Sequence, residues 1–245
     1  ANVNNGTCEY DPLSTLTDID GNVYEVIQIG EQYWLSENLR VAHYNNGDEI
    51  SYITNNADWG SYDEGQFGAY DNDDSYVDTY GYLYNWAVVD DDRGVCPEGY
   101  DVASNVDINL LKSHTGTNAG GVALGGKLKE SGHEHWTYHS DAVSEAATNE
   151  YEFTALPNGA RAPNGNFSQI GEYSHLWSAT PENQTGNRAW KFGAQYNSSG
   201  FNGNYDYDKR TGYAVRCVAD VDTAVGPEIE GCTDDFASNF NPDAN

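Results

Sequence analysis

The clearest alternation of hydrophobic and polar positions lies at residues 23–29, where the sequence VYEVIQI follows an Asp-Gly turn signal at residues 20–21. Successive side chains of a strand point to opposite faces, so this alternation predicts a strand with one buried face. A Gly-Glu pair at residues 30–31 marks a tight turn into a second strand that runs through Trp34. The pattern therefore predicts an antiparallel hairpin at the start of the folded body.

Helical signals are concentrated in the middle of the chain. Ser104 is a candidate N-cap with Asp107 three residues later, which is the spacing of a capping box. The apolar face predicted for this helix is Val106, Leu110 and Leu111. A second short helix is predicted over residues 121–130.

The remaining segments are irregular. Residues 44–80 are rich in Asn, Asp, Gly and Tyr, which favours loops and short strands, and an apolar-aromatic run follows at 82–89. The final third alternates turns with predicted strands at 153–156, 176–179, 189–192 and 213–218. We therefore expect an α+β fold with a loop-rich antiparallel sheet and one or two helices.

Composition adds a strong acidic bias. The chain of 245 residues has 11 Lys plus Arg against 39 Asp plus Glu, a formal net charge of -28. Nucleic acids and anionic membrane surfaces both require a basic face, so neither is an expected partner. No segment is apolar over the length needed to span a bilayer, so we expect no membrane insertion. The chain holds 19 Tyr, a residue that favours strands and interfaces.

The four cysteines are Cys8, Cys96, Cys217 and Cys232. They form no CxxC pair and no histidine stands at zinc-finger spacing, so zinc is disfavoured. An even count in such a chain favours disulfide bonds and an oxidising compartment. Four cysteines allow three pairings, and spacing alone does not choose among them.

The two ends of the chain fit together as one motif. The last residues, GCTDDFASNFNPDAN, overlap the first, ANVNNGTCEY, to give a continuous cysteine-bounded acidic segment. We interpret this as a motif that recurs between larger domains of a longer parent protein, and we expect the chain to be a mature or excised fragment. The predicted divisions are a half-motif at 1–16, a body at 17–218, a linker at 219–230 and the other half-motif at 231–245.

Several phrases of the body occur together in a known order: DIDGNVYEVIQIGEQYWLSENL, GYLYNWAVV, CPEGYDVAS, LKESGHEHW, ATNEYEFTALPNGAR, LWSAT and GYAVRCV. They make residues 17–218 resemble the Fibrobacter succinogenes major paralogous domain family. That family is similar at fold level to C-type lectins and formylglycine-generating enzymes, and its members tend to be secreted or surface lipoproteins. The resemblance implies a lectin-like fold and a disulfide between Cys96 and Cys217.

The terminal motif resembles a second repeat, GCTD-x-x-A-x-N-[YF]-N-P-x-A, which is common in very long exported proteins of gliding and marine bacteria. This resemblance implies a giant multi-domain parent. We expect Cys232 to pair with the equivalent of Cys8 in the next module, and a bridge between Cys8 and Cys232 within one module is the alternative.

The joined terminal motif is also a candidate calcium site. Its oxygen ligands alternate as in a calcium loop, although the late glutamate of an EF-hand is missing. The candidate ligands are Asp234, Asn241, Asp243 and Asn245. The alternative is a disulfide-stapled knot of Asx turns without an ion. The acidic clusters at 71–74 and 90–92 fit solvated loops better than ion sites.

No catalytic arrangement is evident. His133, His135 and His139 fit surface positions better than a metal site, and no nucleophile-elbow context surrounds a serine. A formylglycine-type enzyme needs reactive or metal-binding cysteines, whereas we expect the two body cysteines here to be structural. We therefore expect no enzymatic activity.

Aromatic side chains suggest a sugar platform. The chain lacks the Trp-Asn-Asp phrase of lectin calcium sites and has Pro-Glu-Asn at 181–183 in the wrong order. Four aromatics in one Gly/Asn-rich loop are candidates for stacking on sugar rings: Tyr196, Phe201, Tyr205 and Tyr207. The alternative is that these rings fill a small core of the loop itself.

These observations favour a structural or adhesive module of a large, secreted, repetitive bacterial cell-surface protein or extracellular fibre. Its expected partners are neighbouring copies or modules of the same parent, with calcium as a cofactor at the joint. The alternative function is a carbohydrate-binding, lectin-like module that contacts surface glycans.

Overall fold

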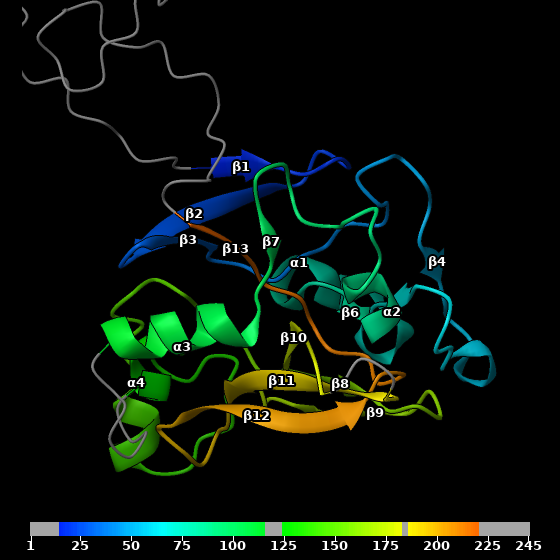
Figure 1. Cartoon of the computed structure of the whole chain (residues 1–245). Coiled ribbons are helices and arrows are strands. Elements are labelled where there is room, and N and C mark those ends of the chain that lie inside the picture. The colour runs from blue at the N-terminus through cyan, green and yellow to red at the C-terminus, as the bar shows by residue number, and fades with distance from the viewer. Residues whose placement is uncertain (1–14, 116–123, 183–185, 221–245) are drawn as a thin grey trace, which may run out of the picture.

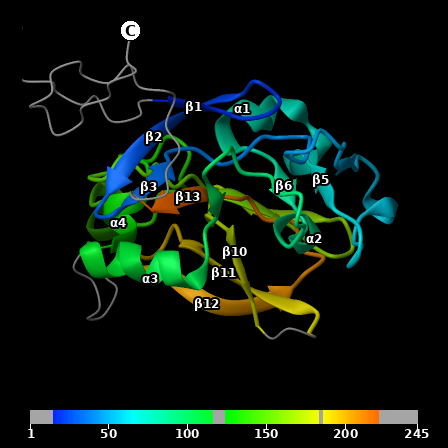
Figure 2. The same cartoon turned by 45° about the horizontal axis from the view of Figure 1, so that its top comes forward.

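The computed structural model describes residues 15–115, 124–182 and 186–220. Two antiparallel sheets lie on opposite sides of the molecule, with short helices between and beside them (Figures 1 and 2). Helices α3 and α4 lie on one flank, and α1 and α2 lie on the other. This mixed, sheet-rich arrangement confirms the predicted α+β class.

The first sheet joins the start of the described chain to its end. Its order is β1-β2-β3-β13-β7, and every neighbouring pair is antiparallel. The strands are β1 (Thr15–Thr17), β2 (Val23–Ile29), β3 (Gln32–Leu35), β7 (Asp101–Val102) and β13 (Cys217–Asp220). The predicted β2–β3 hairpin is present, but the expected single buried face is wrong: Ile27 and Ile29 are buried in one core group and Tyr24 in another, so β2 is buried on both faces. The expected boundary between residues 16 and 17 falls inside β1.

The second sheet has the order β10-β11-β12, formed by β10 (Leu176–Pro181), β11 (Arg188–Ala194) and β12 (Phe201–Asp208). It contains the strands predicted at 176–179 and 189–192. Two smaller sheets are β4 (Ser51–Tyr52), β5 (Gln66–Gly68) and β6 (Leu83–Tyr84), and the hairpin of β8 (Asn158–Arg161) with β9 (Phe167–Ile170). Residues 153–156 are not a strand as predicted, because Ala155 makes only one isolated bridge, to Lys129.

The helices are short. They are α1 (Val77–Tyr80), α2 (Trp86–Val89), α3 (Asn105–His114), α4 (Leu124–Leu128), the 3-10 turns η1 (Asn56–Asp58), η2 (Tyr70–Asn72) and η3 (Asp74–Tyr76), and the π-helical turn η4 (Asp141–Glu145). The predicted capping box of α3 is present: Asp107 accepts from the Ser104 backbone N–H at 2.8 Å, and Ser104 accepts from the Asp107 N–H. The predicted apolar face is correct for Leu111, which is buried, and wrong for Val106 and Leu110, which are 67% and 46% exposed. Ile108 is the second residue that the helix buries.

Three groups of buried side chains hold the elements together. The largest lies among the first sheet, α3 and the second sheet, and includes Trp34, Leu111, Phe153, Phe192 and Val218. The second lies around the disulfide and is rich in tyrosine: Tyr24, Tyr44, Tyr84 and Tyr100. The third packs α2 against β10 and β11 through Trp86, Trp177 and Ala189.

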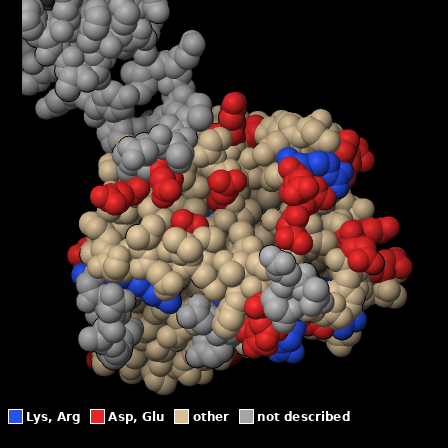
Figure 3. All heavy atoms as spheres, in the orientation of Figure 1, with Lys and Arg blue, Asp and Glu red and all other residues tan. Residues whose placement is uncertain are grey.

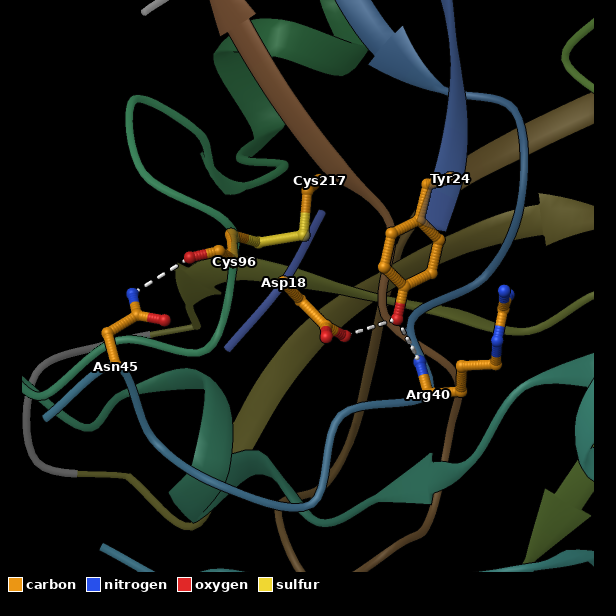
Figure 4. The surroundings of a disulfide bond; sticks show 6 residues. All are labelled: Asp18, Tyr24, Arg40, Asn45, Cys96 and Cys217. Atoms are coloured by element: carbon orange, nitrogen blue, oxygen red, sulfur yellow. Dashed lines mark hydrogen bonds between the residues drawn. A yellow bond between two sulfur atoms is a disulfide. The ribbon is translucent and has the colours of Figure 1, made fainter. Parts of the chain in front are cut away.

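The disulfide between Cys96 and Cys217 is present, with 5.8 Å between the two Cα atoms. It ties the segment before β7 to the first residue of β13, and both cysteines are buried. The Asn45 side-chain amide donates to the Cys96 carbonyl at 2.8 Å (Figure 4). Nearby, the Tyr24 hydroxyl donates to Asp18 at 2.7 Å and accepts from the Arg40 backbone N–H at 3.0 Å. These contacts fix the β1–β2 turn against the loop that follows β3.

Arg216 is a fully buried cation that holds several segments together. Its guanidinium donates to the Leu35 carbonyl at 3.0 Å, to the Phe153 carbonyl at 2.6 Å and to the Asn38 side-chain oxygen at 2.8 Å. Burial lowers the pKa of Arg216 to about 9. The carbonyl dipoles therefore stabilise its charge in place of a carboxylate.

Replacing Arg216 with methionine is expected to lower the free energy of unfolding by about 2–4 kcal/mol, because the three acceptors lose their donor inside the core. Urea denaturation followed by tryptophan fluorescence measures the change. The matched control is Arg188→Met, since Arg188 donates to Asp206 at 2.6 Å on the surface and an exposed ion pair contributes at most about 1 kcal/mol. An Arg216→Met protein as stable as the control would contradict this role.

Candidate functional site

An open cavity of about 500 Å3 lies beside β4. Its lining residues come from three separate segments: Ala42, His43, Glu49, Ile50, Ser51, Tyr52, Phe67 and Tyr82. An antiparallel bridge between His43 and Glu49 forms one side. The parallel pairing of β4 with β5 and the antiparallel pairing of β5 with β6 bring the aromatic residues together.

The floor of the cavity is aromatic. The Tyr52 ring lies 5.0 Å from the Phe67 ring and 6.0 Å from the Tyr82 ring, measured between centroids. Phe67 and Tyr82 are 4.8 Å apart in an edge-on arrangement. Phe67 is only 3% exposed, whereas Tyr52 is 40% exposed. The Tyr52 ring therefore packs on a buried residue while part of its own side chain remains exposed to solvent.

The orientation of Tyr52 is fixed by its hydroxyl, which donates to Asp74 at the start of η3. Burial of the ring and this hydrogen bond to the carboxylate raise the pKa of Tyr52 well above that of free tyrosine. Asp73 caps η3 by accepting from the Ser75 N–H at 2.9 Å. The two consecutive aspartates thus have different roles: Asp73 stabilises the turn, and Asp74 holds the ring.

The rim of the cavity is acidic. His43 Nδ1 lies 2.5 Å from Asp20 Oδ1, and Asp20 also accepts from the Ala42 backbone N–H. Burial raises the pKa of Tyr82, and the nearby Asp74, Asp20 and Asp78 add to that effect. The described lining residues include neither Lys nor Arg. The face of the molecule drawn in Figure 3 has a similar excess of acidic over basic groups, mostly along its edges. The cavity therefore suits ligands that donate hydrogen bonds.

The described residues of the cavity do not form a histidine-activated serine. Asp20 orients His43 as a carboxylate orients a catalytic base, and Ser51 also lines the cavity. No hydrogen bond joins Ser51 to His43, however, and a serine nucleophile depends on that contact for activation.

Among the aromatic residues predicted as a sugar platform, Phe201 does not reach the surface. Residues 201–208 form β12 and not a loop, and Phe201 is 3% exposed because its ring packs on Phe153 and Phe192. Phe201 is therefore a core residue. Tyr196 is partly buried against the main core, and Tyr207 is 37% exposed with its ring 5.7 Å from Tyr213. The side chain of Tyr205 lies outside the described residues.

The terminal candidates also lie outside the described residues: Cys8, Cys232, Asp234, Asn241, Asp243 and Asn245. Within residues 15–115, 124–182 and 186–220, no three His, Cys, Asp or Glu side chains are grouped to hold a metal ion. Over the same residues, the structure has no helix with the length and hydropathy of a membrane span.

The sequence does not predict the β4 cavity, because its lining residues are far apart in the chain. Tyr52 and Tyr82 are separated by a segment without periodicity, and only the small β4-β5-β6 sheet joins them. The single sequence signal is the density of tyrosine at residues 44–82.

The sequence model of the Fibrobacter succinogenes major domain matches residues 27–219. The chain belongs to this family. The matched segment of the major domain runs from within β2 to within β13, so it includes the disulfide and the lining of the β4 cavity. No curated protein and no solved structure matches the chain.

Proposed function

We propose that this major domain is a non-enzymatic, adhesive or structural module of a large, secreted and repetitive bacterial cell-surface protein. The main support is that the described body begins and ends toward one end of the first sheet, whereas the β4 cavity lies beside the other end. Thr15 begins β1 opposite Glu25, and Asp220 ends β13 opposite Gln32 in the β2–β3 hairpin. Because neighbouring strands alternate in direction, both ends of the described body leave on the side of the β2–β3 turn.

The β1–β2 turn stands at the other end of the same sheet. Asp20 of that turn contacts His43 in the wall of the cavity, and Figure 1 shows β4 on the side of the molecule away from the β2–β3 turn. A module attached through its ends thus directs this cavity away from the parent polypeptide. The arrangement suits a domain that is displayed to an external partner, and the buried disulfide suits an oxidising location.

Surface display is tested with antibodies raised against residues 15–220. Intact cells of the source bacterium are expected to bind the antibody without permeabilisation and to lose the signal after external protease treatment. A signal that requires permeabilised cells would contradict the proposed location. A turnover abolished by one substitution in the body would contradict the absence of enzymatic activity.

A carbohydrate-binding, lectin-like module is the second candidate function. The observation that favours it is the partly exposed side chain of Tyr52, which packs on Phe67, with Glu49 in the lining and Asp74 bound to the Tyr52 hydroxyl. The test is a glycan array probed with the full chain. Reproducible binding to one glycan class supports this function, and uniform absence of binding rejects it.

A further inference from the structure

We infer that the β4 cavity binds an uncharged pyranose of a glycan, with Tyr52 as the stacking platform, and that it excludes anionic sugars. This inference rests on the second candidate function. It assigns that function to a place in the fold and to a class of saccharide.

The geometry of Tyr52 suits ring stacking. The C–H bonds on one face of a pyranose carry a small positive charge, which the negative face of an aromatic ring attracts. Two contacts fix the Tyr52 side chain: its ring packs on Phe67, and its hydroxyl donates a hydrogen bond to Asp74. A ligand therefore meets a ring that loses little conformational freedom on binding.

The polar groups of the rim suit sugar hydroxyls. The carboxylate of Glu49 is exposed and has no hydrogen-bond partner among the described residues. A carboxylate accepts from hydroxyls in charge-assisted hydrogen bonds, which are stronger than neutral ones. Ser51 and His43 add groups that donate or accept at the same edge. A cavity of about 500 Å3 also falls within the range of small-molecule sites.

The charge of the rim determines which sugars are excluded. Asp20, Glu49 and Asp74 lie at the cavity or contact its lining, and the lining has no Lys or Arg. A uronate or sulfated sugar would bring a second negative charge beside these groups without a cation between them. Like charges that lie close together repel, and this repulsion lowers the affinity of the cavity for an anionic ligand.

The experiment is isothermal titration of the full chain with neutral hexasaccharides of glucose, mannose and galactose, and with a hexauronate of the same length. We expect at least one neutral hexasaccharide to bind and the hexauronate to bind at least about tenfold more weakly. Tyr52→Ala is expected to weaken neutral binding by about tenfold or more, and Tyr52→Phe by less than about threefold, because its ring remains.

The chain offers a matched control in Tyr138. This residue is 50% exposed and its hydroxyl donates to Asp141 at 2.5 Å, so it resembles Tyr52 except that it lies outside the cavity. Tyr138→Ala is expected to leave affinity unchanged. Glu49→Lys is the second variant in case Tyr52→Ala does not fold. It should weaken neutral binding and bring the affinity for the hexauronate closer to that for the neutral sugar.

Three results would overturn the inference in distinguishable ways. Absence of saccharide binding by the wild-type chain, in this titration and on the array, rejects the carbohydrate function and the site together. Neutral binding that survives both Tyr52→Ala and Glu49→Lys leaves the function intact and rejects this site. Tight binding of tetralysine that depends on Tyr52, with no neutral sugar bound, assigns the cavity to a cationic peptide instead.

Discussion

Replacing Cys96 and Cys217 together with alanine is expected to lower the free energy of unfolding by about 2–5 kcal/mol. The bond spans a sequence separation of 121 residues, and a cross-link restricts the unfolded chain more strongly when the loop it closes is longer. It also fixes β13 at its first residue, in the sheet that contains both ends of the described body. Equilibrium unfolding in urea under non-reducing conditions measures the loss.

The reduced wild-type protein is the control for this substitution. It lacks the cross-link but keeps both side chains, so its stability should fall to within about 1 kcal/mol of the double variant. Peptide mapping before and after reduction verifies that the Cys96–Cys217 bond is present in one sample and absent from the other. An unchanged unfolding midpoint in the double variant would show that the bond does not constrain the unfolded chain.

Local patterns determined the parts of the fold that were predicted correctly. The β2–β3 hairpin follows from the strand-like pattern of residues 23–29 and the Gly-Glu turn at residues 30–31, and the start of α3 follows from the capping box of Ser104 with Asp107. Both signals act within a few residues, so no tertiary information is needed to recognise them. The Cys96–Cys217 pairing was different, since it depended on the family resemblance and not on local pattern.

The errors arose where tertiary contacts decide between alternatives. Residues 106, 108, 110 and 111 are all apolar, so α3 has two candidate faces, and packing against the core selects Ile108 with Leu111. The Asn and Asp residues of β12 disfavour a strand on propensity alone, but pairing along β11 outweighs that preference. Arginine is usually a surface residue, so the sequence does not indicate that Arg216 is buried. Its burial is favourable because three acceptors converge on its guanidinium.

The β4 cavity illustrates the same limit at the level of function. No local sequence pattern distinguishes the aromatic residues of its floor from the others in this Tyr-rich, irregular segment. Their common site exists because a parallel pairing of β4 with β5 lies next to an antiparallel pairing of β5 with β6. Long-range pairing of this kind leaves no periodic trace in the chain, so the candidate site was found only from the structure.

Alkaline conditions are expected to destabilise the protein progressively above about pH 10. Burial raises the pKa of Tyr24, Tyr84 and Tyr213 well above the usual value near 10. The Tyr84 hydroxyl donates to the Val41 carbonyl at 2.7 Å, and the Asp18 carboxylate beside Tyr24 opposes a second negative charge. In the folded state these phenols therefore stay protonated at a pH that ionises them in the unfolded chain.

The sign of the effect follows from proton linkage. A group whose pKa is raised in the folded state contributes stability that is fully present below its unfolded pKa and is lost as pH rises above it. Each such tyrosine removes about 1.4 kcal/mol per pH unit above pH 10, so three remove about 4 kcal/mol per pH unit. Burial lowers the pKa of Lys129 and Lys191 to about 8. Their opposite effect is complete by about pH 10.5. Burial also lowers the pKa of Arg216 to about 9 and that of Arg161 to about 10, which offsets about two of the three tyrosines above that pH and leaves a net loss of about 1.4 kcal/mol per pH unit.

The measurement is tyrosine ionisation at 295 nm alongside near-ultraviolet circular dichroism between pH 8 and 13. The buried tyrosines are expected to ionise in one cooperative step that coincides with loss of tertiary signal, after the exposed ones have titrated gradually. Tyr213→Phe keeps the ring that packs on Trp177 and removes one ionisable group, so stability should fall less steeply with pH, by about 1.4 kcal/mol per unit. Gradual ionisation of every tyrosine in a protein that stays folded would show that these phenols are accessible to solvent, and the burial around Tyr24 and Tyr84 would then be wrong.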